Sequence, residues 1–175
     1  MVSEREKRDC SSEKEFSRTL SVLLWLSLSA GWTVSTFSVI EEMCMVSACR
    51  DTASFTIFGL NMGWFGVAYF TTVLIVLWRR KRDHRLDWIL YALVFSGIGA
   101  ELRLLWIQKF VIGGWCPLCV TICCALFFAG MFLAIEMKRS VEKTEVKSLI
   151  VRLFFAVAMS AIGLAVAVVG VKALY

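Results

Sequence analysis

Two cysteines in the hexapeptide GWCPLC stand at a spacing that supports thiol–disulfide chemistry. Cys116 and Cys119 enclose Pro117 and directly precede a long apolar run. Proline is favoured at the first position of a helix, because its missing N–H is not needed there and its φ is already helical. Pro117 therefore predicts the start of a helix, with Cys119 in a first turn whose dipole stabilises a thiolate. The CxxC spacing permits a reversible disulfide, so we predict a redox pair; the alternative is a buried or static structural pair.

A second pair, Cys44 and Cys49, is separated by the residues MVSA. Alone, this spacing is equally typical of a disulfide that braces a loop. Two neighbouring pairs allow a relay, because a thiolate that attacks a disulfide passes two electrons from one pair to the next. Such a relay moves electrons from a thiol in water to an oxidant dissolved in the membrane. We expect no metal site, since tetrahedral zinc needs four ligands and the single histidine, His84, is predicted on the other side of the membrane.

The elements that must position these cysteines are membrane helices. The 175 residues are 59% hydrophobic and include one proline, and the mean hydropathy is +0.74. A transmembrane helix needs roughly 20 mainly apolar residues, so the sequence predicts an all-α membrane protein. Five segments qualify as spans: Thr19–Ile40, Gly59–Trp78, Leu86–Phe110, Trp115–Ile135 and Leu149–Leu174.

The basic residues alternate between connections. The N-terminal tail, the run RRKRDHR at 79–85 and the segment 138–147 are basic, whereas the connection 41–58 has only Arg50. Because basic loops stay in the cytoplasm, the N-terminus is predicted there and both cysteine pairs on the outer, oxidising side. We interpret RRKRDHR as a topology anchor rather than a nucleic-acid patch. Cys10, on the reducing side, is expected to be a free thiol.

These boundaries divide the chain into four parts. We expect a cytoplasmic tail at 1–18, a four-helix catalytic core at 19–136 and a cytoplasmic linker at 137–148. The core includes an outer loop at 41–58, and a fifth transmembrane helix occupies 149–175.

Three stretches, in order, resemble the bacterial branch of the vitamin K epoxide reductase family. They are CMVSACRDTASF, GLNMGWFGVAY and ELRLLWIQKFVIGGWCPLC, within a similarity that covers residues 20–136. The resemblance implies a four-helix transmembrane bundle around a quinone, with the first outer loop as a lid and the fifth helix peripheral. Many bacterial members carry a fused thioredoxin-like domain that this sequence lacks, so the implied partner is a separate periplasmic thioredoxin-like carrier.

The family's functional residues carry over by position. Cys44 matches the cysteine that exchanges with the partner, and Cys49 the one that passes electrons to Cys116. Cys119 matches the cysteine that reacts with the quinone, either ubiquinone or menaquinone. Ser54 matches a serine at the lip of the quinone pocket.

The rest of the implied pocket departs from the family pattern. Asn61 lies five residues before Gly66, where the family places its asparagine four residues before a glycine, and Met62 occupies that slot. Asn61 is therefore either a hydrogen-bond donor to the quinone or a loop residue that satisfies its own backbone. Phe58 and Trp115 are expected either in an apolar lid and wall or in an aromatic belt at the membrane surface.

Three further residues bear on the chemistry. Cys123 stands where vertebrate members have a tyrosine, which favours plain quinone reduction; the cysteine itself is expected to be a small apolar filler. Glu101 and Arg103 are ionisable groups within a span, which is a hint of function, although both can snorkel toward the interface. Residues two apart on a helix point about 200° apart, so these two should not pair.

The predicted function is a quinone-dependent thiol–disulfide oxidoreductase of the bacterial inner membrane. Electrons would pass from the periplasmic carrier to Cys44/Cys49, then to Cys116/Cys119, and then to the quinone. Two alternatives remain open. One is a quinone-epoxide reductase, and the other is a non-catalytic membrane scaffold whose disulfides only brace loops.

Overall fold

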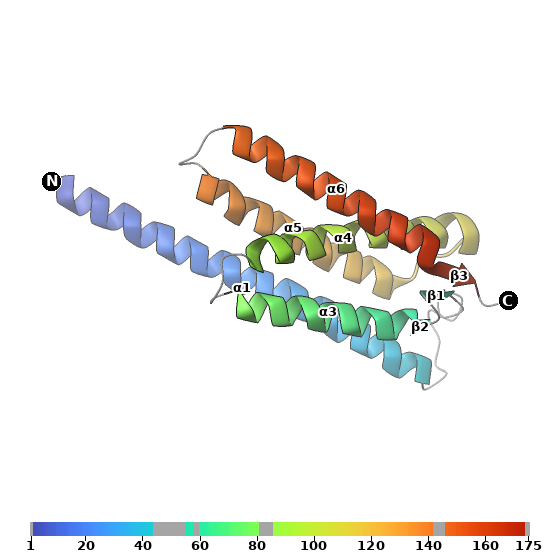
Figure 1. Cartoon of the computed structure of the whole chain (residues 1–175). Helices are drawn as coiled ribbons and strands as arrows, with labels where there is room; N and C mark the ends of the chain where they lie inside the picture. Colours follow the sequence, from blue (N-terminus) through green and yellow to red (C-terminus); the bar gives the residue numbers. More distant parts are fainter. Residues whose placement is uncertain (1, 44–54, 58–59, 81–85, 142–145, 174–175) are drawn as a thin grey trace.

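The described residues form five α-helices, with a small sheet at one end. The structure is a computed structural model and describes the backbone of residues 2–43, 55–57, 60–80, 86–141 and 146–173 (Figure 1). Side chains are described over 18–40, 63–80, 86–111, 113–136 and 150–170. The helices are α1 (Val2–Met43), α3 (Met62–Arg79), α4 (Leu86–Ile107), α5 (Pro117–Val141) and α6 (Val146–Gly170).

Four of these helices form a closed bundle. α1 packs against α3 and α5, and α4 packs against the same two helices from the opposite side. Two hydrogen bonds join α1 to its neighbours: Ser27 Oγ donates to the carbonyl of Ala125 at 2.6 Å, and Trp32 Nε1 donates to Thr71 Oγ1 at 3.1 Å. The N-terminal part of α1 extends beyond the other helices (Figure 1). The predicted all-α membrane fold is confirmed.

The core of the bundle is a continuous apolar cluster contributed by every helix. The buried members of the cluster come from all five α-helices: Leu24, Leu28, Phe70, Val73, Leu77, Leu90, Tyr91, Val94, Ile98, Leu126, Ala129, Leu133 and Ala156. Many large apolar side chains instead face outward, as the lipid-facing surface of a membrane protein requires. Within the described residues, four helices are long and apolar enough to cross a membrane, which is compatible with a multi-pass membrane protein.

The second expected span is shorter than the others. Its apolar helical part runs over Gly63–Arg79, below the length of the four candidate spans. The whole of α3, Met62–Arg79, has 18 residues and extends about 27 Å at ~1.5 Å per residue, slightly less than a hydrocarbon core of about 30 Å. The expected start at Gly59 is wrong because Leu60–Asn61 forms a strand, and the expected helical end of span five is wrong because Val171–Ala173 forms another.

The fifth helix lies outside the four-helix ring and is held closely against α4. A Cβ added at Gly163 would lie 1.9 Å from the carbonyl oxygen of Ser96, and one added at Gly99 would lie 1.9 Å from that of Ser160. The two helices thus cross backbone to backbone, each presenting a Ser-x-x-Gly sequence to the other. Small residues permit this approach in membrane helices, where packing rather than water exclusion drives association.

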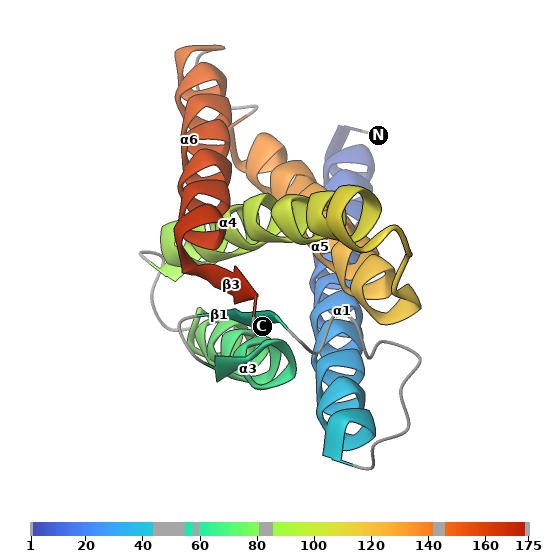
Figure 2. The same ribbon diagram turned by 90° about the vertical axis from the view of Figure 1, so that its right-hand side faces the viewer.

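A three-stranded antiparallel sheet closes one end of the molecule. β1 (Phe55–Ile57) pairs with β2 (Leu60–Asn61), and on its other edge with β3 (Val171–Ala173). Figure 2 shows β3 leaving the end of α6 and lying beside β1, near the start of α3. The last described strand of the chain is therefore bonded to a strand that lies near the end of the expected outer loop, 41–58.

The opposite end is held by an ion-pair network. Arg80, just after α3, binds Asp87 at the start of α4 through its Nε. Its Nη2 lies 2.6 Å from Glu136 Oε1, near the end of α5. One arginine thus joins the ends of three helices. It lies at the edge of the run RRKRDHR, of which residues 81–85 lie outside the described part.

Candidate redox site

The turn before the CPLC sequence has a defined backbone. α4 continues into a π-helix, η1 (Gln108–Ile112), which ends at Gly113 with a left-handed φ of 75°. The N–H of Gly114 donates to the carbonyl of Gln108 at 3.2 Å. Glycine adopts positive φ without the steric penalty of a side chain, so Gly113 allows the chain to reverse directly toward α5.

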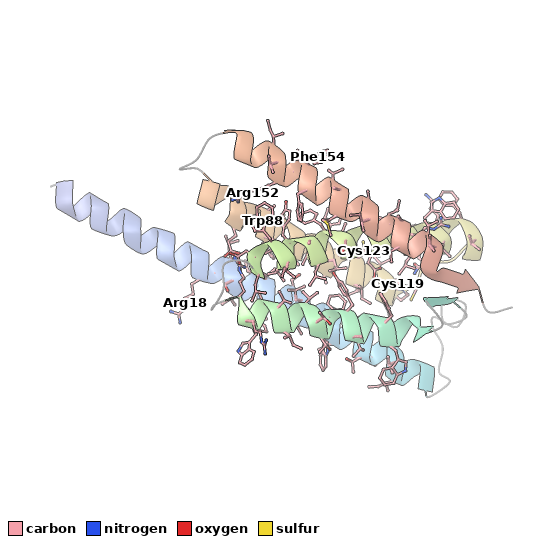
Figure 3. The ribbon with its side chains drawn as sticks, in the orientation of Figure 1. Arg18, Trp88, Cys119, Cys123, Arg152 and Phe154 are labelled. Carbon is pink, nitrogen blue, oxygen red and sulfur yellow. The ribbon has the colours of Figure 1, made fainter. Side chains whose placement is uncertain are left out.

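The predicted start of the fourth helix is confirmed. α5 begins at Pro117, and the carbonyl of Cys116 accepts the first helical hydrogen bond, from the N–H of Val120 at 3.1 Å. Cys116 therefore occupies the N-cap position and Cys119 the first turn, as the proline indicated. Figure 3 shows Cys119 nearer than Cys123 to the end of the molecule that carries the sheet.

The two cysteines of CPLC are in different chemical states. Cys116 is disulfide-bonded and only 5% exposed, whereas Cys119, Cys123 and Cys124 are free thiols. The Cys116–Cys119 disulfide is therefore not the one present. The other cysteines of the chain, Cys10, Cys44 and Cys49, have side chains outside the described part of the structure.

Gln108 links this site to α4 and was not predicted from the sequence. Its side chain is 1% exposed, and its Oε1 accepts the N–H of Cys116 at 3.3 Å. The same amide interacts with the Cys119 thiol, although its Nε2 makes no hydrogen bond of acceptable geometry in the described structure. The available signal was a neutral polar residue near the end of an apolar span, eight positions before Cys116.

Glu101 lies on the same face of α4, two turns before Gln108. Its carboxylate interacts electrostatically with the thiols of Cys119 and Cys123, and its Oε2 is buried without a hydrogen-bond partner among the described residues. The expectation that it would not pair with Arg103 agrees with the described ion pairs. The Arg103 guanidinium instead lies 4.4 Å from the centre of the Trp106 ring.

The remaining expected site residues are Cys44, Cys49 and the residues of the expected quinone pocket. Cys44, Cys49, Ser54 and Phe58 lie outside the described residues. Asn61 ends strand β2 and Met62 begins α3, and their side chains also lie outside the described set. Trp115 directly precedes Cys116 and is 60% exposed, so it lies at the surface of the bundle, with its ring available to lipid or to the outer loop.

The described part of the site therefore consists of one disulfide-bonded cysteine, Cys116, and one free thiol, Cys119, at the start of α5. Two polar side chains face them: Gln108 of η1, which is buried, and Glu101 of α4, whose Oε2 is buried. This arrangement can exchange one disulfide for another, and it places a donor amide and a carboxylate beside the thiol that is left over. No family model matches the chain, and no curated protein matches it.

Proposed function

We propose that this protein is a thiol:quinone oxidoreductase of a bacterial inner membrane, which reoxidises a separate periplasmic thioredoxin-like carrier. The proposal rests on one observation: Cys116 is disulfide-bonded while Cys119, its neighbour in CPLC, is a free thiol. A metal site would need both thiolates of the CxxC pair, and a static brace would use Cys116 alone. A relay uses both cysteines in this split state, because one member must bond to another pair while the second is released.

The backbone limits which cysteine can be joined to Cys116. α1 and α5 run antiparallel (Figure 1) and touch where Ser27 meets Ala125. Cys10 lies 17 residues before Ser27 on α1, and Cys116 lies nine residues before Ala125, at the start of α5. Because the two helices are antiparallel, these two distances point in opposite directions and add. At ~1.5 Å per helical residue the two are about 40 Å apart, far beyond the Cα separation of a disulfide. This leaves Cys44 and Cys49, and the family resemblance favours Cys49.

The proposed sequence of exchanges balances at each step. The carrier's dithiol reduces the Cys44–Cys49 disulfide and leaves oxidised. The Cys49 thiolate then attacks Cys116, which forms Cys49–Cys116 and releases Cys119. Cys44 attacks Cys49 next, which restores Cys44–Cys49 and releases Cys116. Cys116 and Cys119 close their own disulfide again and give up two electrons and two protons.

The described residues beside Cys119 suit a quinone as the acceptor. Nε2 of Gln108 is a buried donor without a partner, and a quinone carbonyl oxygen accepts such a bond. An unpaired buried donor is unfavourable by about 1–3 kcal/mol, so a ligand oxygen in this place stabilises the site. When bound, a quinone accepts two electrons and two protons and becomes a quinol. Gln108 would hold it, together with the expected pocket residues Ser54, Phe58, Asn61, Met62 and Trp115.

The test uses the full chain in lipid nanodiscs that contain ubiquinone or menaquinone, with a reduced thioredoxin-fold protein as the thiol donor. We expect thiol oxidation and quinone absorbance to change together, at one quinone per dithiol. Cys119→Ala should abolish quinone reduction, whereas Cys124→Ala, which removes an exposed free thiol, should leave it unchanged.

Three outcomes would contradict the proposal. Quinone reduction that survives Cys119→Ala would remove the central sulfur from the relay. Turnover with a quinone epoxide but not with a quinone would indicate the reductase alternative. Cysteines that never exchange with the carrier would indicate a scaffold.

A further inference from the structure

A carboxyl group buried in the interior of a membrane bundle needs a reason to be there. An ionisable side chain within a span is unfavourable by a few kcal/mol and is usually functional. Glu101 lies in the last third of α4, and its Oε2 is buried with no hydrogen-bond partner in the described structure. None of the described ion pairs involves it, because these join Arg80 to Asp87 and to Glu136 at the far end of the bundle.

The helical register points Glu101 toward the cysteines of α5. Gly97, Glu101 and Gln108 follow a spacing of four and seven residues, which places them on one face of α4 and of the start of η1, which continues it. Gly97 packs against Leu126 of α5, and Gln108 binds Cys116. Glu101 lies between these two contacts, opposite the α5 residues that precede Leu126, and Cys119 and Cys123 both interact with it electrostatically.

The groups that face Glu101 from the neighbouring helices are few. From α5 they are the thiols of Cys119 and Cys123, and from α3 it is the hydroxyl of Tyr69. Tyr69 already donates its proton to the carbonyl of Leu93 at 2.8 Å, so it does not compete for the carboxylate. The described titratable neighbours that remain are therefore the two thiols.

We infer that Glu101 is the proton acceptor for the Cys119 thiol. This inference rests on the proposed function, and it assigns a role to a residue that the exchange steps do not use. The Cys119 S–H bond breaks, its electron pair stays on sulfur, and its proton passes to a carboxylate oxygen of Glu101. The thiolate can then close the Cys116–Cys119 disulfide. The two electrons lost in that closure, and the proton held by Glu101, would pass to the quinone of the proposed function. Gln108 keeps Cys116 in register beside it during this step.

Cys119 is preferred over Cys123 as the donor of this proton. Both thiols interact with Glu101, but only Cys119 is also in contact with the Gln108 amide and stands in the CxxC pair. Cys123 lies one helical turn deeper on the same face of α5.

The test measures the reactivity of Cys119 without any quinone. The full chain in nanodiscs is treated with N-ethylmaleimide, in a Cys123→Ala/Cys124→Ala background, and labelling of Cys119 is followed by peptide mass spectrometry across a range of pH. In Glu101→Gln we expect labelling at neutral pH to slow about tenfold or more, since positioned bases commonly contribute 10²–10⁴. The solvent deuterium isotope effect on labelling should fall as well. Arg103→Gln is the matched control, because Arg103 is also a partly buried charged residue of α4 but lies against Trp106.

The opposite result is equally clear. If the carboxylate were only a negative neighbour, its removal would make the thiolate easier to form and labelling would become faster. Faster or unchanged labelling therefore overturns the inference. Glu101→Asp, which keeps a carboxylate, should restore part of the rate and covers the case in which the glutamine variant misfolds. Because no quinone is present, a failure here is distinct from a failure of the proposed function, which would appear as absent quinone reduction in the unaltered chain.

Discussion

Replacing Gln108 by leucine separates the role of this side chain in the site from its role in stability. The substitution removes the 3.3 Å hydrogen bond to Cys116 N–H. A buried N–H left without a partner is unfavourable by about 1–3 kcal/mol. The same substitution also removes Nε2, a buried donor that has no partner at present, which is worth about as much in the opposite direction. We therefore expect the free energy of unfolding to change by only about 1 kcal/mol.

The effect on electron transfer should be much larger. In the proposed relay, Cys119 leaves as a thiolate beside the Gln108 amide, and a hydrogen bond to a charged group contributes about 1.5–3 kcal/mol. At about 1.4 kcal/mol per factor of ten, loss of that bond slows the release of Cys119 by about 10- to 100-fold. Loss of the Cys116 anchor, which holds the attacked sulfur in place, acts in the same direction.

The assay measures formation of the Cys49–Cys116 mixed disulfide in a single turnover. The reaction is quenched with acid, and the remaining thiols are trapped and counted. Unfolding is followed in parallel by tryptophan fluorescence in the same detergent. Lys109→Gln is the control, since Lys109 is the next residue and is exposed. A leucine variant that forms the mixed disulfide at the unaltered rate would refute this account of Gln108. So would a loss of rate that only parallels a large loss of stability.

Three further predictions concern the packing that holds the site. Gly163→Ala should destabilise the protein by about 1–3 kcal/mol or more, because the new methyl group would meet the Ser96 carbonyl at 1.9 Å. The control variant Gly114→Ala, with no atom within 4 Å of the added methyl, should have little effect. Equal thermal unfolding of the two variants would contradict the helix crossing. Arg80→Ala should lower the free energy of unfolding by about 1–3 kcal/mol, because it leaves Asp87 and Glu136 without their shared cation; the exposed neighbour variant Arg79→Ala should not. Tyr69→Phe should destabilise by about 1 kcal/mol through loss of the bond to Leu93, yet it should relieve part of the damage of Gly97→Ala, whose methyl group would lie 2.1 Å from the Tyr69 hydroxyl; additive effects in the double-mutant cycle would contradict this contact.

The helices and the position of the CPLC sequence follow from local signals. Apolar runs of membrane length set the helices, and Pro117 sets the start of α5, because both depend on residues close together in the chain. The sheet does not follow from such signals. Its strands have two or three residues, too few for an alternating pattern, and β3 pairs with a strand more than a hundred positions earlier. The close crossing of α4 and α6 is non-local in the same way, since Gly99 and Gly163 are needed only because the backbone of the other helix lies against each of them.

The position of Cys116 and Cys119 at the start of α5 could be predicted from the sequence, but the polar side chains beside them could not. Cysteine chemistry is specific enough for spacing to indicate a role. An amide such as Gln108 or a carboxylate such as Glu101 acquires a role only when a neighbouring helix brings a partner to it. The register of α4 against α5, which places both beside Cys119, depends on side-chain packing that a single sequence does not display.

The pairing of β3 with β1 has a consequence for how this protein is handled and fused. The carboxyl-terminal end of the chain emerges from a strand hydrogen-bonded to the segment just after Cys44 and Cys49. An affinity tag or fluorescent reporter attached there would lie beside the β1–β3 pair, and its bulk could disturb that pairing. A fusion at the amino terminus, at the far end of α1, would avoid this strand pair (Figure 1).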